Sequence, residues 1–240
     1  MRGNRWFPTI LAVFVTSLIV SNIIAVKLFT LFEMTLPAAV ILFPVAYIFG
    51  DVLTEVYGYA RARQAIWIGF GCNLLAVTAI WLGGLLPADP YWNAGVYENA
   101  FEASRAYHAI LGYSPRLLLA SFMAYLVGEF LNSYVLAKLK IATHGRLLWV
   151  RTIASTLIGQ GADSAIFISI AFIGVIPTNI LGMTIVFQWL FKSLYEAMAT
   201  PLTYVIVNAL KRAEGEDFFD QETDFNPIRL SIGNIRNSSE

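Results

Sequence analysis

Six stretches of this chain are each long and apolar enough to cross a lipid bilayer as a helix. A membrane-spanning helix needs roughly 20 consecutive, mostly apolar residues. The predicted spans are about 7–28, 36–58, 64–87, 116–138, 152–176 and 179–210. Only 13% of the residues are charged, whereas a soluble domain carries about 25%. We therefore expect an all-α integral membrane protein with six transmembrane helices.

The sequence divides into a membrane domain over residues 1–210 and a polar tail over residues 211–240. The first apolar run continues to about Phe32, well past the 7–15 apolar residues of a signal peptide, so it predicts a retained span. Pro37 is placed to start the second span and Gly58 to end it. The tail is polar and acidic, which predicts little fold of its own.

Lysine and arginine near the ends of the spans indicate the orientation, because cytoplasmic loops carry an excess of these residues. With the N-terminus inside, ten of them flank the inner ends and three flank the outer ends. The inner set is Arg2, Arg5, Arg61, Arg63, Lys138, Lys140, Arg146, Arg151, Lys211 and Arg212, and the outer set is Lys27, Arg105 and Arg116. We therefore expect both termini in the cytoplasm.

The longest loop, about 88–115, then lies outside the cell. Its segment ENAFEASRAYHAILG carries apolar residues at helical spacing on one face, namely Ala103, Ala106, Tyr107, Ile110 and Leu111. This pattern predicts an amphipathic helix at the membrane surface. A lid over a substrate entrance is the alternative.

Ionisable residues occur inside four of the predicted spans. They are Asp51 and Glu55 in the second, Glu129 in the fourth, Asp163 in the fifth, and Lys192 and Glu196 in the sixth. A charged residue at the centre of a membrane helix costs about 2.5–3.5 kcal/mol, so six facing lipid would cost on the order of 15 kcal/mol. We therefore expect these side chains to face the interior of the bundle.

Helical spacing places these residues on polar stripes with other polar side chains. The stripes are Asp51, Thr54, Glu55 and Gly58; Tyr125, Glu129, Asn132 and Ser133; Thr156, Gln160, Asp163, Ser164 and Phe167; and Gln188, Lys192, Tyr195, Glu196 and Thr200. Together they predict a polar cavity near the middle of the membrane or somewhat toward the cytoplasm, where many transporters hold their substrate.

Purely structural uses of the same residues are the alternative. Hydrogen bonds between polar side chains join membrane helices, and Lys192 with Glu196 has the spacing of an ion pair within one helix. Ser17, Ser21 and Ala25 form a ridge of small residues on the first span. Such a ridge permits close helix packing, either within the chain or against a partner membrane subunit.

Several classes of protein find little support in the sequence. The formal net charge is zero, so the total charge indicates no nucleic-acid partner. There is no HExxH motif and no Gly-x-x-x-x-Gly-Lys loop, so the sequence indicates neither a zinc-dependent hydrolase nor ATP hydrolysis by that loop. An intramembrane enzyme using Asp51 and Asp163 as paired carboxylates remains an alternative. We expect no catalytic residues, no metal and no cofactor.

Five segments in order resemble one family of membrane proteins. They are NIIAVKLF, FPVAYIFGDVLTEVYGYARAR, SPRLLLASFMAYLVGEFLNSYVLAKLK, STLIGQGADSAIFISIAFIG and KSLYEAMATPLTYVIVNALK. From about Ser21 to Lys211 the chain resembles the queuosine precursor transporters. These belong to the vitamin uptake transporter group, which is related to the substrate-binding subunits of energy-coupling factor importers. The resemblance carries over to Asp51, Glu55, Tyr57, Gly58, Arg61, Ser155, Gln160, Asp163, Lys192, Glu196 and Pro201.

The resemblance implies uptake of the cyano or aminomethyl deazaguanine precursors of the tRNA nucleoside queuosine. A guanine-like edge offers an N–H and an NH₂ group side by side, and one carboxylate can accept both. Asp163 or Glu196 is the preferred acceptor, and Phe167, Tyr195 or Trp189 is expected to stack on the ring. The predicted binding residues are Asn22, Asp51, Glu55, Glu129, Gln160, Asp163, Phe167, Gln188, Lys192, Tyr195 and Glu196.

Two other transport functions stay open at this point. A proton-coupled carrier for another small polar solute also needs acids inside the membrane. A substrate-binding subunit that works only with energising membrane partners is the other alternative, and a homo-oligomer is equally compatible with the sequence. In each case we expect a multi-pass protein of the bacterial inner membrane, whose partners are the lipid bilayer and a small-molecule substrate.

Overall fold

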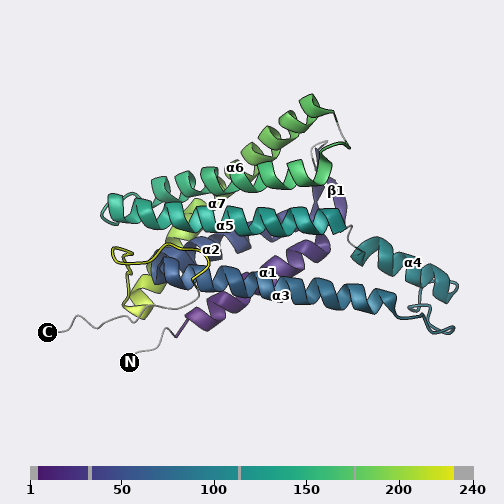
Figure 1. Ribbon diagram of the computed structural model, residues 1–240. Coiled ribbons are helices and arrows are strands. Elements are labelled where there is room, and N and C mark those ends of the chain that lie inside the picture. The colour runs from purple at the N-terminus through teal and green to yellow at the C-terminus, as the bar shows by residue number, and fades with distance from the viewer. Residues whose placement is uncertain (1–4, 32–33, 113–114, 176, 230–240) are drawn as a thin grey trace.

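The computed structural model describes residues 5–31, 34–112, 115–175 and 177–229, and its long elements are helices laid side by side (Figure 1). In chain order the helices are α1 (Phe7–Ile24), α2 (Phe43–Tyr57), α3 (Tyr59–Leu85), α4 (Ala100–Leu111), α5 (Pro115–Ala142), α6 (Leu148–Phe172) and α7 (Thr178–Glu214). Two short strands, β1 (Leu28–Leu31) and β2 (Met34–Pro37), and a 3₁₀ helix, Ala38–Ile41, lie between α1 and α2.

The bundle has two distinct ends (Figure 1). The terminal end contains the start of α1, the end of α7 and the segment that follows α7. At the opposite end, which we call the hairpin end, lie strands β1 and β2 and helix α4. Each long helix runs from one end to the other, so a residue's position along its helix gives its depth in the bundle.

Four of the predicted spans correspond to segments of the described chain that are long and apolar enough to cross a membrane. These are Phe7–Ile24, Tyr59–Leu85, the stretch Ala100–Ala142 in which α5 lies, and Leu148–Phe172. Helix α2 has only 15 residues, about 22 Å at the rise of an α-helix, which is less than the roughly 30 Å hydrocarbon core. Helix α7 has the length but also carries Lys192 and Glu196.

The prediction of a purely helical chain needs one correction. Strands β1 and β2 pair antiparallel, with Thr30 opposite Thr35 and Leu28 opposite Pro37. The second helix therefore begins at Phe43, not at about residue 36, and Pro37 closes a strand. Pro44 supplies the proline at the start of the helix, where its missing N–H costs no helical hydrogen bond.

The junction between α2 and α3 confirms the prediction made for Gly58. Helix α2 ends at Tyr57 and α3 starts at Tyr59, so one residue joins the two helices. Gly58 has φ of 82°, a left-handed conformation that glycine adopts without a steric penalty. A side chain at this position would also meet the ring of Phe218.

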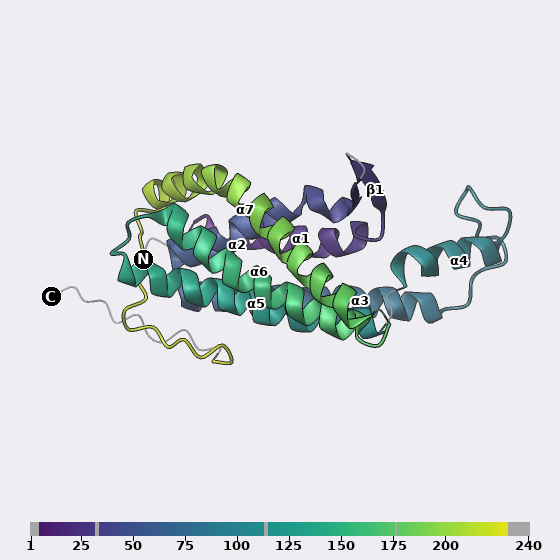
Figure 2. The same ribbon diagram turned by 90° about the horizontal axis from the view of Figure 1, so that it is seen from above.

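Helix α7 is a single 37-residue helix that contains Pro201. Proline removes one backbone donor and kinks helices, and α7 changes direction along its length in the view from above (Figure 2). This helix contains the whole of the sixth predicted span, about 179–210, and it packs against α2 and α6.

The predicted amphipathic helix of the outer loop is α4, which begins after the capping side chain of Asn99. Ala103 on its predicted apolar face is buried, and the Tyr107 hydroxyl donates to the carbonyl of Ile80 on α3 at 2.9 Å. Ile110 on the same face is half exposed. Helix α4 projects beyond the bundle at the hairpin end (Figure 1), and its role at the membrane surface or as a lid stays a prediction.

Candidate functional site

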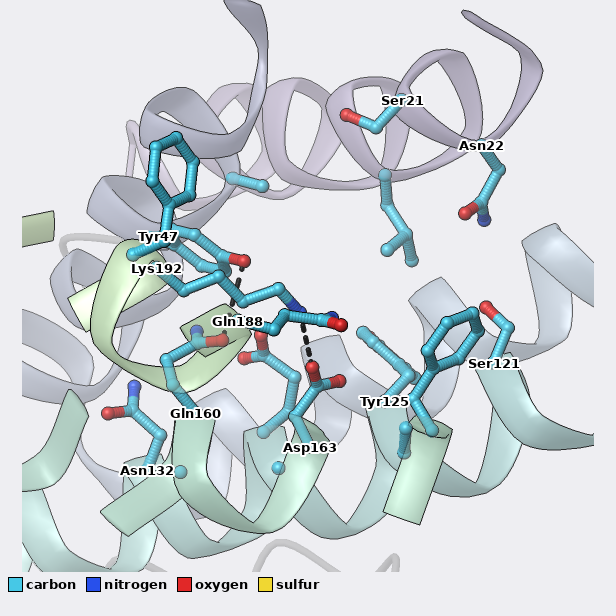
Figure 3. A pocket seen from close by; sticks show the side chains of 18 of the residues that line it. Ser21, Asn22, Tyr47, Ser121, Tyr125, Asn132, Gln160, Asp163, Gln188 and Lys192 are labelled. Carbon is cyan, nitrogen blue, oxygen red and sulfur yellow. Dashed lines mark hydrogen bonds and ion pairs between the residues drawn. The ribbon is translucent and has the colours of Figure 1, made fainter. Parts of the chain in front are cut away.

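A cavity of about 480 Å³ lies among helices α1, α2, α5, α6 and α7. Its volume falls within the roughly 300–1,000 Å³ of small-molecule sites. Figure 3 shows polar side chains from these helices around it. The lining residues are Phe14, Leu18, Ser21, Asn22, Pro37, Ala46, Tyr47, Ser121, Ala124, Tyr125, Gly128, Glu129, Asn132, Gly159, Gln160, Asp163, Phe167, Thr184, Phe187, Gln188, Phe191 and Lys192.

The cavity lies toward the hairpin end of the bundle. Tyr47 is in the first turns of α2, and Asn22 is in the last turn of α1. On α7, the lining ends at Lys192, well before the end of the helix at Glu214. Helical spacing gave the face of each residue but not its position along the bundle, and the depth of the cavity in the membrane stays a prediction.

One ion pair crosses the cavity from α6 to α7. The ammonium of Lys192 lies 2.5 Å from a carboxylate oxygen of Asp163, and the two side chains are 15% and 20% exposed. The pair is drawn in the centre of Figure 3. Partial exposure leaves these groups able to exchange partners with a solute, because neither is sealed by protein on all sides.

A second carboxylate, that of Glu129 on α5, also lines the cavity. Within the described part of the chain it forms no ion pair, and Lys192 is the only lysine or arginine among the residues that line the cavity, which thus holds two acids and one cation. An acid-rich cavity attracts N–H groups and cations, because hydrogen bonds to an ionised acceptor are stronger than neutral ones.

Amide and hydroxyl groups surround the ion pair. The Tyr47 hydroxyl donates to the side-chain oxygen of Gln160 at 3.5 Å (Figure 3). Asn22 donates to Asn73 on α3 at 3.0 Å. Gln188 on α7 also lines the cavity. These groups both donate and accept, so the cavity can read the mixed edge of a heterocycle.

Two glycines fix the position of Asp163 by bringing α5 and α6 close together. A Cβ atom added at Gly128 would lie 2.9 Å from the Cβ of Asp163 and 3.2 Å from the carbonyl oxygen of Gly159. One added at Gly159 would lie 2.8 Å from the Cβ of Asn132. No larger residue fits at either position without moving a helix, so this contact sets where the carboxylate enters the cavity.

Aromatic side chains supply much of the remaining wall. Phe167 lines the cavity as predicted, together with Phe14, Phe187 and Phe191. The rings of Phe187 and Phe191 are nearly parallel at 6.5 Å, and flat apolar walls of this kind suit a planar ring. Trp189, the other proposed stacking residue, instead donates to the carbonyl of Leu157 and does not line the cavity.

The cavity thus collects seven of the eleven predicted binding residues. They are Asn22, Glu129, Gln160, Asp163, Phe167, Gln188 and Lys192. The other four, Asp51, Glu55, Tyr195 and Glu196, do not line it. Tyr195 stacks on Phe191 at 6.4 Å, and the three acids lie one or more helical turns farther toward the terminal end.

Asp51 and Glu196 form a buried polar layer with residues of α5 and α6, on the terminal side of the cavity. Asn132 donates to Asp51 at 3.0 Å, and Thr156 donates to Glu196 at 2.6 Å. Asp51 is 2% exposed and Glu196 is 6% exposed. Neither forms an ion pair with a described residue. Lys192 pairs with Asp163 on another helix, so the alternative ion pair with Glu196 within α7 is not formed.

Glu55 lies deeper still, with no exposed surface. Its Oε1 atom accepts from Arg151 and from Lys211, each at 2.7 Å, and lies 3.7 Å from the ammonium of Lys140. These three cations were predicted to flank the membrane as orientation signals. Arg151 and Lys140 are buried with Glu55 and supply the partners that a buried carboxylate requires. Their use as orientation signals stays a prediction.

The sequence prediction missed several residues of the cavity wall. Tyr125 and Asn132 were on the predicted stripe of the fourth span but not among the proposed binding residues. Tyr47 lies one helical turn before Asp51 on the same face of α2, and this spacing was the available signal. Ser21 and Ser17 are buried inside the chain, which confirms internal packing as a use of the small-residue ridge.

A smaller cavity of about 140 Å³ adjoins the first and shares Asn22, Ser121 and Phe167 with it. Its walls come from α1, α3, α5 and α6 and carry no ionisable side chain. Asn73, which accepts from Asn22, is its other strongly polar residue. The described residues contain no group of three His, Cys, Asp or Glu side chains placed to hold a metal ion.

Comparison with known proteins gives three findings. A family model described as "Putative vitamin uptake transporter" matches residues 37–206. A Bacillus subtilis (strain 168) protein named "Probable queuosine precursor transporter" is 32% identical over 187 residues, which cover 77% of each chain. An Escherichia coli (strain K12) protein named "Queuosine precursor transporter" is 28% identical over 138 residues, covering 54% of this chain and 52% of the relative. No solved structure matches the chain.

Proposed function

Because this chain belongs to the vitamin uptake transporter family, we propose that it imports deazaguanine precursors of queuosine across the bacterial inner membrane. The substrates are 7-cyano-7-deazaguanine, 7-aminomethyl-7-deazaguanine or both. The observation that carries this proposal is the cavity itself, in which the Asp163–Lys192 pair, the Gln160 amide and aromatic walls lie within one volume of about 480 Å³.

Each of these groups has a role toward a guanine-like ring. Asp163 accepts the ring N–H and the exocyclic NH₂ together, and Lys192 donates to the ring carbonyl. Gln160 and Asn22 read the remaining edge, and Phe167 stacks on the flat face. We favour Asp163 over Glu196 for the NH₂ edge, because Asp163 lines the cavity whereas Glu196 lies beneath it.

The two substrates place different demands on the cavity. Glu129 supplies a carboxylate for the cation of the aminomethyl precursor. The adjoining uncharged cavity with the Asn22 and Asn73 amides suits the neutral cyano group. A site with both features accepts either precursor, and it rejects analogues that lack the NH₂ group because its own buried acceptor is then left unpaired.

In the proposed orientation, α1, α2, α3, α5, α6 and α7 all cross the membrane and both termini are cytoplasmic. The hairpin end then faces outward, and the cavity lies on the side from which the substrate arrives. The short α2 is extended toward this side by the 3₁₀ helix and the β1–β2 hairpin. Paired strands satisfy their own backbone groups, as any segment near the hydrocarbon must.

The direct test uses a bacterium that cannot synthesise the precursors and lacks its own importer. The cyano base is supplied at low concentration, and queuosine in tRNA is measured with and without this gene. Asp163→Asn and Lys192→Ala should each lower uptake at least tenfold, about 1.4 kcal/mol of binding free energy. Asp89→Asn and Lys27→Ala make the same chemical changes at exposed positions outside the cavity and should transport normally.

Normal uptake in both cavity variants would remove the proposed site. Failure of this gene to restore queuosine in tRNA would point to another small solute. Uptake by this chain expressed alone in a heterologous strain favours a solitary transporter, whereas dependence on added membrane proteins favours a substrate-binding subunit.

A further inference from the structure

The terminal end of the bundle is closed by an ion cluster built from four helices and the segment that follows α7. Glu55 of α2 holds Arg151 of α6 and Lys211 of α7 at 2.7 Å each. Lys140 of α5 completes the cluster, since its ammonium donates to the backbone carbonyl of Glu55 at 2.6 Å. Asp217, beyond α7, accepts from Lys140 at 2.5 Å and from Lys211 at 2.9 Å.

The segment 216–229, which we call the C-terminal strap, continues from this cluster across the helix ends. The Phe218 carbonyl accepts from Lys140 at 2.7 Å. The Phe218 ring packs against Gly58, in space that a larger side chain at that position would fill. The ring of Phe219 lies 4.7 Å from the Lys140 ammonium. The strap therefore covers the cluster directly. It lacks regular secondary structure, as predicted, but it is docked on the bundle through named contacts.

A second set of contacts anchors the strap to the first turns of α3. Both carboxylate oxygens of Asp220 accept from the backbone amide of Tyr59 at 3.0 Å, and the Asp220 side chain is buried. This places a carboxylate at the start of α3, where it interacts favourably with the helix dipole. Arg63 donates to the carbonyls of Asp224 and Asn226, and Trp67 donates to that of Pro227.

A line of polar groups leads from the cavity to this cluster. It passes through the Asp51–Asn132 and Glu196–Thr156 layer and then the hydrogen bond from Thr54 to Ser133. Glu55 follows Thr54 directly in α2. A solute that leaves the cavity toward the terminal end has to cross this line, and the ion cluster under the strap blocks its exit.

We propose that the Glu55 cluster and the C-terminal strap form the gate on the cytoplasmic side, and that the strap must release Lys140 and Lys211 for the substrate to leave. This inference rests on the proposed transport and orientation. The gate has two parts with different exposure. Glu55, Arg151 and Lys140 are at most 1% exposed, whereas the Asp217 side chain is 44% exposed, so water can replace its partners.

The charge state of Asp217 is consistent with its place in the exposed part of the gate. Burial works to raise its pKa, but hydrogen bonds from Lys140 and Lys211 outweigh that effect and lower the pKa of Asp217 below its usual value. The carboxylate therefore stays ionised at neutral pH. Of its two ion pairs, the one with Lys211 is the more exposed, since the side chains are 19% and 44% exposed. Lys140 is 1% exposed, but its ammonium keeps the backbone carbonyl of Glu55 as a partner when Asp217 leaves.

The chain offers matched controls for testing this gate. Asp217 is next to Glu216, and Lys211 is next to Arg212; Glu216 and Arg212 are exposed and form no ion pair with a described residue. Asp217→Asn and Lys211→Gln therefore weaken the strap, whereas Glu216→Gln and Arg212→Gln make the same charge changes beside it. Removal of the strap after Gly215 is the strongest variant.

The readout is access to Ser133, which is 2% exposed between the cavity and the cluster. Ser133→Cys is introduced with Cys72→Ala, and inside-out vesicles are treated with a charged, membrane-impermeant maleimide. Asp217→Asn, Lys211→Gln and strap removal should each speed labelling at least tenfold over the parent, and the two control variants should not. Thermal denaturation of each variant identifies any variant that has lost its fold. An unfolded variant would also be labelled by reagent added from the hairpin side.

Equal labelling of the parent, Asp217→Asn and the strap-less protein, all folded, would overturn the gate. Faster labelling in Glu216→Gln as well would also overturn it, because the effect would then follow net charge and not the named contacts. The assay needs no solute, so the gate can fail while the proposed substrate stands, and the substrate can fail while the gate stands.

Discussion

The cavity and the Glu55 cluster are made of the same kinds of side chain but hold them in opposite ways. In the cavity, Lys192 and Asp163 have each other as partners, and both retain exposed surface toward an open volume. In the cluster, Glu55 has no exposed surface and is held by several cations. The number of partners and the free space beside a charge thus separate a group available to a ligand from one that holds helices together.

The largest effect expected from this comparison concerns two acids one helical turn apart on α2. Glu55→Gln leaves the buried Arg151 without its carboxylate, which should cost about 3–5 kcal/mol of unfolding free energy. Asp51→Asn changes a side chain whose partner is the neutral Asn132, so its cost should be about 1 kcal/mol. Denaturation of the purified proteins in detergent measures both.

The two variants remove the same charge from the same helix, so each is the control for the other. Equal destabilisation would show that Glu55 is no more structural than Asp51, and the contrast between cavity and cluster would then fail on its strongest point.

An intermediate effect is expected where α5 and α6 touch behind Asp163. Gly128→Ala places a methyl group 2.9 Å from the Cβ of Asp163, and overpacking of this kind costs about 1–3 kcal/mol. We expect it to lower both stability and uptake, because the carboxylate is displaced along with the helix. Gly182→Ala is the control, since no atom lies within 4 Å of the added methyl group.

If Gly128→Ala transports like the parent, Asp163 does not need the position that the α5–α6 contact gives it. A loss of stability without a loss of uptake would make the same point and confine the glycine to packing.

The smallest effect is the pH response of the strap. Lys140 and Lys211 lower the pKa of Asp217 in the folded protein, against the opposing effect of burial. Ionised Asp217 therefore stabilises the docked strap at pH values above its unfolded pKa of about 3.9. This stabilisation is lost as the pH falls through the lower folded pKa. Hydrogen exchange of the Phe218 and Phe219 amides should therefore differ between parent and Asp217→Asn by less than about 1 kcal/mol. The difference should be constant between about pH 5 and 8, and a change within that range would contradict the assignment.

The sequence predicted the helices and their polar faces well, because both follow from local periodicity. The stripes containing Glu129, Gln160, Asp163 and Lys192 do meet in one cavity. The same rule placed Glu55 with them, since it shares a face with Asp51. Local sequence patterns did not predict that Glu55 forms ion pairs with Arg151 and Lys211, which are 96 and 156 residues away along the chain.

The β1–β2 hairpin and the strap were harder to predict for related reasons. The hairpin lies within a mostly apolar run that also has the composition of a helix, and Glu33, Pro37 and Pro44 are its main interruptions. The strap is polar and acidic, which is typical of a segment without a core. Its order comes from contacts made by residues such as Asp220 with distant helix ends, and composition does not report such contacts.

The single residue between α2 and α3 limits how this transporter can move. With Gly58 as their entire connection and Phe218 seated against it, the two helices lack the slack to slide past each other or to tilt independently. The end of α2 and the start of α3 therefore have to move together. Any cycle that exposes the cavity first to one side and then to the other has to carry this junction as a unit, with the remaining helices supplying the relative displacement.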